Sequence, residues 1–312
     1  MKRVGEILQV LSFVVALSTA ILALLAFWIA YQQFEEEREA RAWMLLSNKT
    51  TGSAGKAPAM EFLSDREIDL SAIDLSCTAM GGGWNAQNLT CQRPVVLSQL
   101  DLRTREITRC ERQLDYFCLK RLAEENEVAL NSASFAGAHM DGANLTASKI
   151  TGADFSGASL WTTKLDFASA RMAKFVNAKL ISASVKNADL SHSNLVLADL
   201  TDSDLAGSDL TNANISAVYW CDKWKSLCAR NLTPKQIESA WAFDLFWFPN
   251  GLPDYLLATD GSTPQPKLCP FDNKIHGQPQ DHIFPPEDCE HRVPPPSQSE
   301  TEEIIRRKGG AN

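Results

Sequence analysis

The sequence lacks the motifs that mark the common enzyme classes. It contains no Gly-Lys-Ser/Thr phosphate loop, no Gly-x-Gly-x-x-Gly dinucleotide fingerprint and no helical His-Glu-x-x-His metal motif. Its 8 cysteines include no Cys-x-x-Cys pair of the kind that zinc modules use, and none of its 5 histidines lies near a Ser or Cys nucleophile motif. We therefore expect a protein that is not an enzyme and that needs no metal or cofactor.

Positive charge is also absent from one long stretch. No Lys or Arg occurs between Asn187 and Asp222, and the whole chain has a formal net charge of -8. Nucleic-acid-binding domains carry a basic patch or stripe, and no such domain is evident here. No nucleic-acid partner is therefore expected.

The first part of the chain contains a long uncharged segment. Leu8 to Tyr31 carries no charge and is apolar apart from Gln9 and a few hydroxyl residues, and at 1.5 Å per residue it can cross the ~30 Å hydrocarbon layer of a membrane. Trp28 and Tyr31 stand where interfacial aromatic residues belong. A cleaved signal peptide is the alternative, but its apolar region is normally about 7–15 residues long. We predict an uncleaved, single-pass membrane anchor.

The charges that flank this segment predict its orientation. Lys2, Arg3 and the amino terminus precede it, whereas Arg38 and Arg41 are the positive residues that follow it. The side with more positive charge usually stays in the cytoplasm. This narrow difference favours a cytoplasmic amino terminus, with the bulk of the chain on the extracytoplasmic side.

The centre of the chain repeats a five-residue pattern from Ala133 to Ala217. Starting at Phe135, every fifth residue as far as Ile215 is large and apolar, except Ala170, and the residue two places earlier is always Ala, Ser or Thr. Five residues turn about 500° on an α-helix, so such centres would share no face, and on a flat strand they would alternate sides. The chain must therefore bend once per unit, which predicts a stacked solenoid.

Units such as Ala143-Asn144-Leu145 and Ala198-Asp199-Leu200 resemble those of the pentapeptide-repeat proteins. The resemblance implies a mainly β fold, a right-handed quadrilateral β-helix in which four units form one square coil. Such a family is defined by its scaffold rather than by a chemistry, so the fold alone does not give the function. Ser191 is expected to point outward. The centres expected to fill the axis include Phe135, Leu145, Phe155, Leu160, Phe175, Leu180, Leu190, Leu200 and Leu210.

The segments around the repeats have more ordinary patterns. Ile68-Asp69-Leu70 and Ile73-Asp74-Leu75 look like two stray units of a first layer, and 106–130 is typical of a capping helix. Thr233 and Pro234 mark the start of a later helix. The expected parts are a flank (1–7), a transmembrane helix (8–31), a juxtamembrane helix and linker (32–60), a Cys-containing region with the capping helix (61–130), the solenoid (131–220), a cap (221–260) and a Pro-rich polar tail (261–312).

The cysteines suit an oxidising compartment because they are even in number and all follow the apolar segment. Cys110 and Cys118 would lie about 12 Å apart on one continuous helix, too far for a disulfide. Disulfides and reduced structural thiols both remain open. The pairs that could each close a local loop are Cys77 with Cys91, Cys221 with Cys228, and Cys269 with Cys289.

Charged residues at outward positions of the repeat change sign along the solenoid. Positive residues occupy the first two-thirds and acidic residues the last part. This pattern is either an ordinary solvated surface or a charge gradient that selects an oppositely charged partner. The candidate interaction surface comprises Lys164, Lys174, Lys179, Asp199, Asp204 and Asp209.

Together these features predict a membrane-anchored, non-catalytic scaffold or protein-interaction module with a protein partner that the sequence does not identify. Homo-oligomers are compatible with this interpretation. The first alternative is a binding or sensing module in which the Cys-containing region or the tail docks a partner and the solenoid is only a spacer. The second is an enzyme with an unrecognised site in 61–130.

Overall fold

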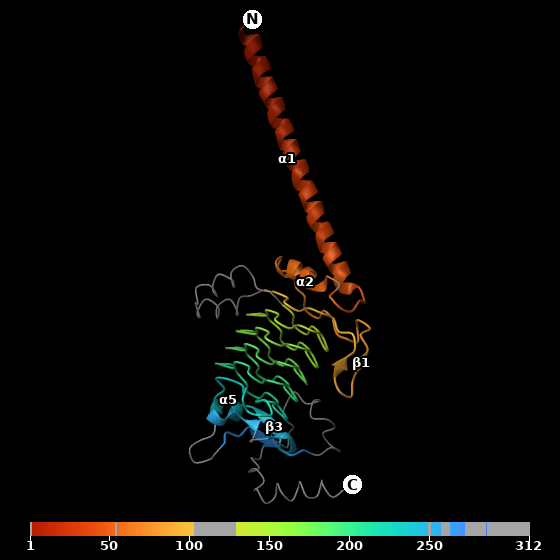
Figure 1. Ribbon diagram of the computed structural model, residues 1–312. Helices are drawn as coiled ribbons and strands as arrows, with labels where there is room; N and C mark the ends of the chain where they lie inside the picture. The colour runs from red at the N-terminus through yellow and green to blue at the C-terminus, as the bar shows by residue number, and fades with distance from the viewer. Residues whose placement is uncertain are drawn as a thin grey trace, which may run out of the picture.

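The computed structural model describes residues 2–53, 55–102, 129–248, 251–256, 263–271 and 285. Helix α1 (Lys2–Ser47) projects from one end of a stack of coils, and α2 (Lys56–Ser64) lies at the same end (Figure 1). Helix α5 (Pro234–Ser239) and strand β3 (Trp241–Phe243) lie at the opposite end, here called the distal end. The predicted capping helix falls almost entirely outside the described residues, as do Cys110, Cys118 and Cys289.

The coils are held together by parallel pairing between residues twenty positions apart. Ser134 pairs with Asp154, and Asp154 pairs with Lys174. The Phe135 amide donates to the Asp154 carbonyl (2.7 Å), and the Asp154 amide donates back to the Ala133 carbonyl (2.9 Å). Because twenty residues comprise four units, each coil has four sides. The predicted β-solenoid is confirmed for this stack.

A left-handed residue forms every corner of the coil. The residue two places after each centre has a positive φ at every unit from Ser132 to Ala217, and Gly occupies only some of these corners. The Ala133 amide donates to the Leu130 carbonyl across the first corner (3.0 Å). In a type II turn, the carbonyl of the first residue accepts from the amide of the fourth, and only the third residue has a positive φ. These turns provide the single bend per unit that the five-residue period requires.

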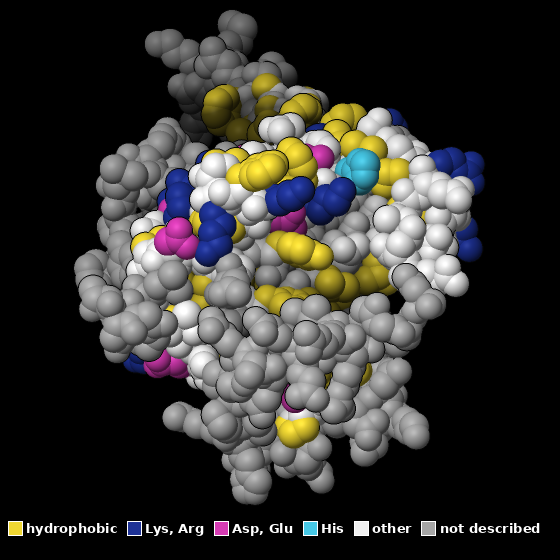
Figure 2. All heavy atoms as spheres, turned by 60° about the horizontal axis from the view of Figure 1, so that its bottom comes forward, with side chains coloured by type: hydrophobic (Ala, Val, Ile, Leu, Met, Phe, Trp, Pro, Cys, Tyr) yellow, Lys and Arg dark blue, Asp and Glu magenta, His cyan; other side chains and the backbone are white. Residues whose placement is uncertain are grey.

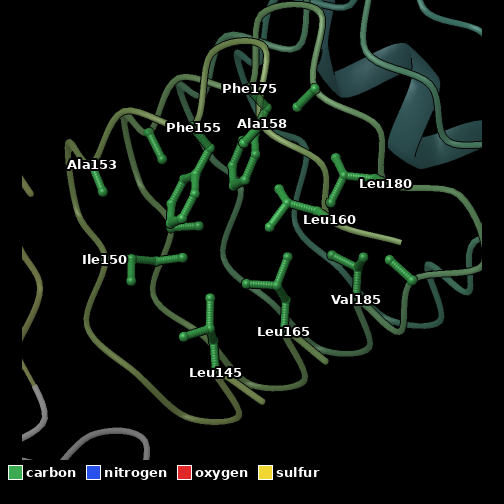
Figure 3. Close-up of a cluster of buried hydrophobic side chains, with 14 of the residues drawn as sticks. Leu145, Ile150, Ala153, Phe155, Ala158, Leu160, Leu165, Phe175, Leu180 and Val185 are labelled. Carbon is green, nitrogen blue, oxygen red and sulfur yellow. The ribbon is translucent and has the colours of Figure 1, made fainter. Parts of the chain in front are cut away.

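The apolar centres fill the axis of the stack. All nine centres predicted for the core, from Phe135 to Leu210, are at most 2% exposed. Phe135, Phe155 and Phe175 stack in one column, with ring centroids 5.3 and 5.2 Å apart (Figure 3). Ala153 and Ala158 are also fully buried, and their small side chains allow the walls to approach the axis.

Ser191, which was predicted to point outward, is more buried than an outward position suggests. Its exposure is only 5%, and its amide donates to the Asp189 carboxylate (2.9 Å). The twenty-residue repeat places Arg171 and Thr211 at the equivalent corners of the coils on either side. A residue that points outward from one coil is therefore shielded by its neighbours in the stack.

The residue before each centre stabilises the turn that follows. Asp154 accepts a hydrogen bond from the Ser156 amide (2.9 Å), Asp199 from the Thr201 amide (3.1 Å) and Asp209 from the Thr211 amide (2.8 Å). Asn side chains form the same bond in other units, as at Asn144 and Thr146. Short side chains of this kind satisfy turn amides that no other group reaches. The frequent Asp and Asn at this position thus have a role in the fold itself.

The first coil is assembled from two separated segments. The Leu70 amide donates to the Ala129 carbonyl (3.0 Å) and the Leu75 amide to the Ser134 carbonyl (2.8 Å), so the predicted first layer is confirmed. Residues 95–102, which were not predicted as units, form its remaining sides. There the Leu97 amide donates to the His139 carbonyl (2.6 Å). The intervening residues include an antiparallel hairpin of β1 (Trp84–Asn85) and β2 (Thr90–Cys91).

The distal end is closed by short elements. Helix α5 begins with Thr233 as N-cap and Pro234 at its first turn, as predicted, and Gln236 completes a capping box. Strand β4 (Lys267–Cys269) pairs in parallel with β3, which covers the edge of β3. The prediction of a polar tail from 261 onward is therefore wrong for β4, whose Leu268 and Cys269 are buried. Short 3-10 helices η1 (Asp244–Phe246) and η3 (Asp254–Leu256) complete the described cap.

The corner geometry predicts that Thr162→Gly stabilises the protein. Thr162 is exposed and has φ 54°. A residue with a Cβ pays about 1–2 kcal/mol in this conformation, whereas Gly loses roughly 0.5–1 kcal/mol through the entropy of the unfolded chain. We expect the free energy of unfolding to rise by about 0.5 kcal/mol in denaturant titrations.

The matched control is Thr211→Gly, at an exposed position one residue earlier in an equivalent turn, where φ is not positive. It relieves no strain, so we expect it to lower the free energy of unfolding by about 0.5–1 kcal/mol. Shifts in the same direction for both variants would contradict the assignment of the corner residue.

Candidate interaction surfaces

The six charged residues predicted to form one surface lie on four different sides of the rod. The pairing places Lys179 beside Asp199 on one side, and Lys164 and Asp204 on a second, separated by Ser184. Lys174 lies on a third side, and Asp209 on the fourth beside Asp189. Because every fifth residue moves to the next side, residues close in sequence are separated in space. The six residues therefore do not form one contiguous patch.

The hairpin of β1 and β2 forms a second candidate surface, which we call the side arm (residues 77–91). A disulfide between Cys77 and Cys91 closes it, with a Cα–Cα distance of 5.8 Å. The arm lies beside the coils rather than projecting from them (Figure 1). The Asn177 side-chain amide donates to the Asn88 carbonyl (3.3 Å) and so fixes the arm to a coil.

The arm rests on a column of corners that includes two glycines. A Cβ at Gly157 would lie 2.1 Å from the Leu89 carbonyl oxygen and 3.0 Å from the Trp84 ring. A Cβ at Gly137 would lie 2.8 Å from the same ring and 2.9 Å from the Cys91 Cβ. At each glycine the shortest distance is below 3.0 Å, closer than real Cβ contacts, so at these two corners the arm can dock only because the residue has no side chain. Trp84 thus packs on the rod, and the Cys-containing region belongs to the rod surface.

The junction between α1 and the stack depends on one buried cation. Lys56, the first residue of α2, is fully buried, and its ammonium donates to the carbonyls of Leu45 (2.8 Å), Leu46 (3.3 Å) and Asn48 (2.7 Å). These carbonyls lie at the end of α1, where helical acceptors lack partners and the dipole attracts positive charge. Burial lowers the pKa of Lys56. We call this arrangement the Lys56 latch.

Further contacts fix the direction of α1 at the same junction. Arg66 forms an ion pair with Glu35, and the Arg38 guanidinium lies over the Phe62 ring, 4.6 Å from its centroid. Leu46 is buried against the core. The latch could not be predicted from the sequence, because a lysine in a polar linker is usually solvated.

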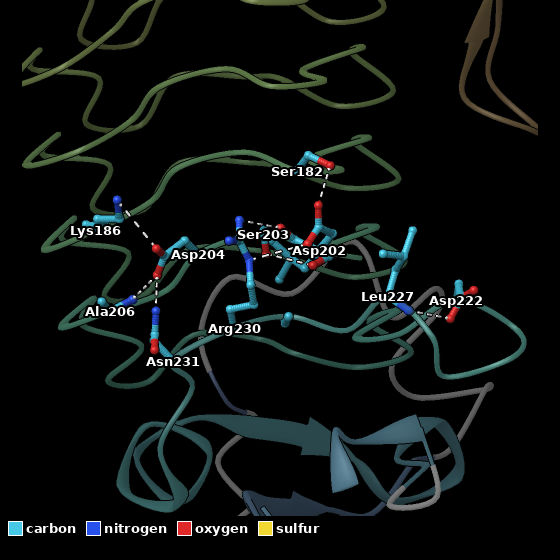
Figure 4. Close-up of polar contacts among 12 residues, drawn as sticks. Ser182, Lys186, Asp202, Ser203, Asp204, Ala206, Asp222, Leu227, Arg230 and Asn231 are labelled. Atoms are coloured by element: carbon cyan, nitrogen blue, oxygen red, sulfur yellow. Dashed lines mark hydrogen bonds and ion pairs between the residues drawn. The ribbon is translucent and has the colours of Figure 1, made fainter. Parts of the chain in front are cut away.

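At the distal end, two acidic residues connect the last full coil to the cap (Figure 4). Asp204 accepts from the side chain of Asn231 (2.8 Å) and pairs with Lys186 (3.4 Å), one coil earlier. Asp202 accepts from Ser182 (2.8 Å) and pairs with Arg230 (3.3 Å). The acidic end of the predicted charge gradient is therefore partly neutralised by contacts within the protein.

The pKa of Asp204 is set by opposing effects. Burial would raise it, but the hydrogen bonds from Asn231 and Ala206, together with the Lys186 ammonium, lower it below the usual value of 3.8. The folded protein therefore favours the ionised form of the Asp204 side chain over its protonated form.

A third candidate surface is the loop from Cys221 to Cys228, which immediately follows the repeats. Its two cysteines form a disulfide with a Cα–Cα distance of 3.9 Å. Asp222 accepts hydrogen bonds from the Leu227 amide (3.0 Å) and the Ser226 hydroxyl (2.6 Å), which lower the pKa of Asp222. The sequence predicted the disulfide but not the exposed Trp224 that the loop carries.

Within the described residues, no cluster of three or more His, Cys, Asp or Glu side chains could hold a metal ion. His139 is exposed on the rod surface. Cys269 is disulfide-bonded as well.

The family model described as "Pentapeptide repeats" matches residues 126–161, 163–195 and 178–217, with 8 copies. The chain contains pentapeptide repeats. The matched residues coincide with the part of the stack in which one unit follows another without interruption. The assignment thus rests on two independent observations, the family model and the repeated corner geometry.

Solved structures similar to the pentapeptide-repeat segment include a pentapeptide repeat protein, Rfr23, from the cyanobacterium Cyanothece 51142. The two are 30% identical over 29% of this chain and 55% of that one, with a TM-score of 0.15, so the match spans about half of Rfr23. A trypsin-treated variant of QnrB1, a plasmid-mediated fluoroquinolone resistance protein, is 16% identical over 79% and 86%, with a TM-score of 0.26. HetL from Nostoc sp. strain PCC 7120, involved in heterocyst differentiation regulation, is 20% identical over 57% and 72%, with a TM-score of 0.21. No curated protein matches the chain.

The docking of the side arm predicts that Gly157→Ala destabilises the protein more than Gly152→Ala does. Both glycines have φ near +65° (65° and 67°), so alanine costs about 1 kcal/mol of backbone strain at each. Only at Gly157 does the new Cβ also meet the arm, since at Gly152 the nearest atom is 3.6 Å away. We expect a further loss of about 1–3 kcal/mol at Gly157 in the free energy of unfolding. Equal losses would show that the arm does not press on this corner.

The lowered pKa of Asp204 predicts a stability difference that depends on pH. The unfolded carboxyl titrates near 3.8 and the folded one lower, so its stabilisation is present above 3.8 and disappears as the pH falls through the folded pKa. We expect Asp204→Asn to lower the free energy of unfolding by about 1 kcal/mol at neutral pH and by much less near pH 2. Asp209→Asn, at an exposed position, is the comparison. A constant difference across pH would exclude a charged role for Asp204.

Proposed function

We propose that the protein is a single-pass membrane-anchored scaffold that holds a rigid pentapeptide-repeat rod at a fixed angle to the membrane. The observation that carries this proposal is the continuity of α1, which passes from an apolar segment directly into the Lys56 latch. Residues from Phe13 onward form a helix with a mean hydropathy of 2.5 in its most apolar window, and none of that window is buried in the protein. Such a surface is stable only in an apolar environment.

The latch supports a rigid junction between α1 and the rod rather than a flexible linker. A scaffold that only needed attachment could use a Gly- or Ser-rich linker, which behaves as a random coil. Here the end of α1 contacts α2 and the first coil through buried Leu46 and the three bonds of Lys56. Any partner bound to the rod would therefore be held at a defined distance and orientation from the membrane.

The expected extracytoplasmic location is supported by the two described disulfide pairs, Cys77–Cys91 and Cys221–Cys228, because disulfides persist in oxidising compartments. A signal sequence near the amino terminus would satisfy the same criteria of length and composition as the anchor. These two roles predict different fates for α1.

Membrane extraction and topology labelling test the proposal. The full chain should remain in the membrane fraction after alkaline carbonate washing and should keep its amino-terminal residues. In a Thr211→Cys variant, whose new thiol is exposed on the rod, a membrane-impermeant maleimide should label intact cells. Release of a shortened, soluble chain would contradict the anchor. Labelling only after permeabilisation would contradict the extracytoplasmic location.

The latch yields a separate prediction for Lys56→Met. Methionine fills similar volume but removes the ammonium that donates to the Leu45 and Leu46 carbonyls, while the Asn48 carbonyl keeps its bond from the Thr50 amide (2.7 Å), at a cost of about 1–3 kcal/mol. We expect the variant to stay in the membrane while the chain near Asn48 becomes sensitive to limited proteolysis. Lys49→Met, which alters an exposed lysine close by, should leave the proteolysis pattern unchanged. Equal sensitivity of both variants would show that Lys56 does not fix the junction.

A further inference from the structure

Two exposed aromatic side chains lie on the same side of the rod. Trp161 is 48% exposed and Tyr219 55%, and among residues 129–220, all of which the structure describes, no other large hydrophobic side chain is exposed. The ladder that runs from His139 to Tyr219 in steps of twenty residues defines this side, and Trp161 lies in its second row. We call it the aromatic face, and its outward residues are His139, Ser159, Trp161, Lys179, Ile181, Asp199 and Tyr219.

The fold holds the two aromatic residues at a fixed separation. Tyr219 lies three coils beyond Trp161, and at ~4.8 Å per coil this is about 14 Å along the rod. The Asp141 carboxylate accepts from the Trp161 amide (3.1 Å) and from the Ser159 hydroxyl (2.6 Å). The Tyr219 amide donates to the Ala198 carbonyl (2.9 Å). A surface fixed before binding loses little conformational entropy when a ligand arrives.

The residues between the two rings are polar, and their charges cancel. Exposed Lys179 lies beside Asp199 in the ladder. The apolar area is therefore divided into two separate contacts. Figure 2 likewise shows hydrophobic side chains that stand among charged and polar ones. A protein interface usually has an apolar centre inside a polar rim, and a charged polymer would require an excess of opposite charge. The aromatic face has neither feature.

We propose that the aromatic face binds an extended, uncharged glycan strand of β-linked N-acetyl amino sugars, which lies along the rod. The C–H groups on the face of a sugar ring are partly positive and stack on the negative face of an aromatic ring. Two such rings, Trp161 and Tyr219, would hold two sugars of one strand, and Lys179 and Asp199 between them can bond to its hydroxyl groups. A strand with β-linkages is straight, so it can follow the ladder from one ring to the other.

The acetamido group of the sugar is chosen from one further contact. Ile181 occupies the position equivalent to Trp161 in the next coil and is half-buried. It offers an apolar contact for an acetyl methyl group beside the stacked sugar. The inference rests on the proposed extracytoplasmic location, because structural glycans of this kind lie outside the cytoplasm. It deepens that function by naming the class of molecule that the rod would hold.

Calorimetric titration of the full chain with chitohexaose provides the first test, in micelles of a detergent that has no sugar headgroup. Chitohexaose should bind, cellohexaose should bind more weakly because it lacks the acetamido groups, and maltohexaose, whose α-linkages curve the strand, should not bind. Absence of chitohexaose binding would overturn the inference. Equal binding of cellohexaose would overturn the choice of amino sugar, and binding of maltohexaose would overturn the extended geometry.

Variants of Trp161 test whether the ring itself makes the contact. Trp161→Ala should weaken chitohexaose binding about tenfold, whereas Trp161→Tyr, which keeps an aromatic face, should retain most of the affinity. Trp161→Leu keeps an apolar side chain without a ring and should lose as much as Trp161→Ala. Equal affinities of the Leu and Tyr variants would overturn the stacking contact.

The matched control is Trp43→Ala, because Trp43 is also exposed (37%) but belongs to α1. Its affinity for chitohexaose should equal that of the wild-type protein, and a loss as large as that of Trp161→Ala would overturn the assignment to the aromatic face. Thermal melting checks that each variant is folded. Tyr219→Ala provides a second variant if Trp161→Ala melts early, and it should also weaken binding.

Carbonate washing of membranes from the same cells separates this inference from the proposed function. A chain that stays in the washed membrane but does not bind chitohexaose after extraction would overturn the glycan site and leave the anchor in place. A chain that is released in soluble form but binds chitohexaose would contradict the proposed function alone.

Discussion

The left-handed residue at every fifth position is the constraint on which the rest of the structure depends. Each one turns the chain by a quarter of a coil, so that four units return it to the same side and the ladder pairs residues twenty apart. Most of these corners are not glycine and therefore carry strain. The inter-coil hydrogen bonds and the burial of one apolar centre per unit offset that strain. Without the stack, no interaction would offset the strain at each corner.

The same constraint determines where other elements can attach. Corners of successive coils form columns along the rod. Another segment can pack closely on a column only where the corner side chains are absent or short. The side arm lies over Gly137 and Gly157 and bonds to Asn177 in the next coil of that column. Gly152 forms an equivalent corner, but a Cβ there would meet only the Ser132 hydroxyl, at 3.6 Å. Glycine thus serves two purposes here: it relieves strain at any corner, and at the arm it also provides room.

The sequence predicted the repeat because a period of five excludes both a helix and a flat strand. It predicted the α5 cap and two disulfide pairs for equally local reasons. It did not predict which charges share a side, because that depends on the four-unit coil as well as on the spacing of five. Ser191 is more buried than its outward position suggests for a related reason, since the adjacent coils cover it. Lys56 and β4 gave no signal, because each gains its role only from a segment distant in space.

The two ends of the rod share one physical solution to a common problem. At each end the chain must leave the repeat, and the backbone groups of the last turn lose the partners that the ladder would supply. At the end next to α1, the Lys56 ammonium donates to the carbonyls of Leu45, Leu46 and Asn48. At the distal side, Gln236 donates to the carbonyls of Leu205 and Ser208 (2.9 Å each), and Asp204 holds Asn231.

Polar side chains, together with apolar burial, therefore join α1 and the cap to the stack. Bonds of this kind fix direction as well as distance. A rod joined in this way at both ends keeps its distal cap in a constant relation to α1.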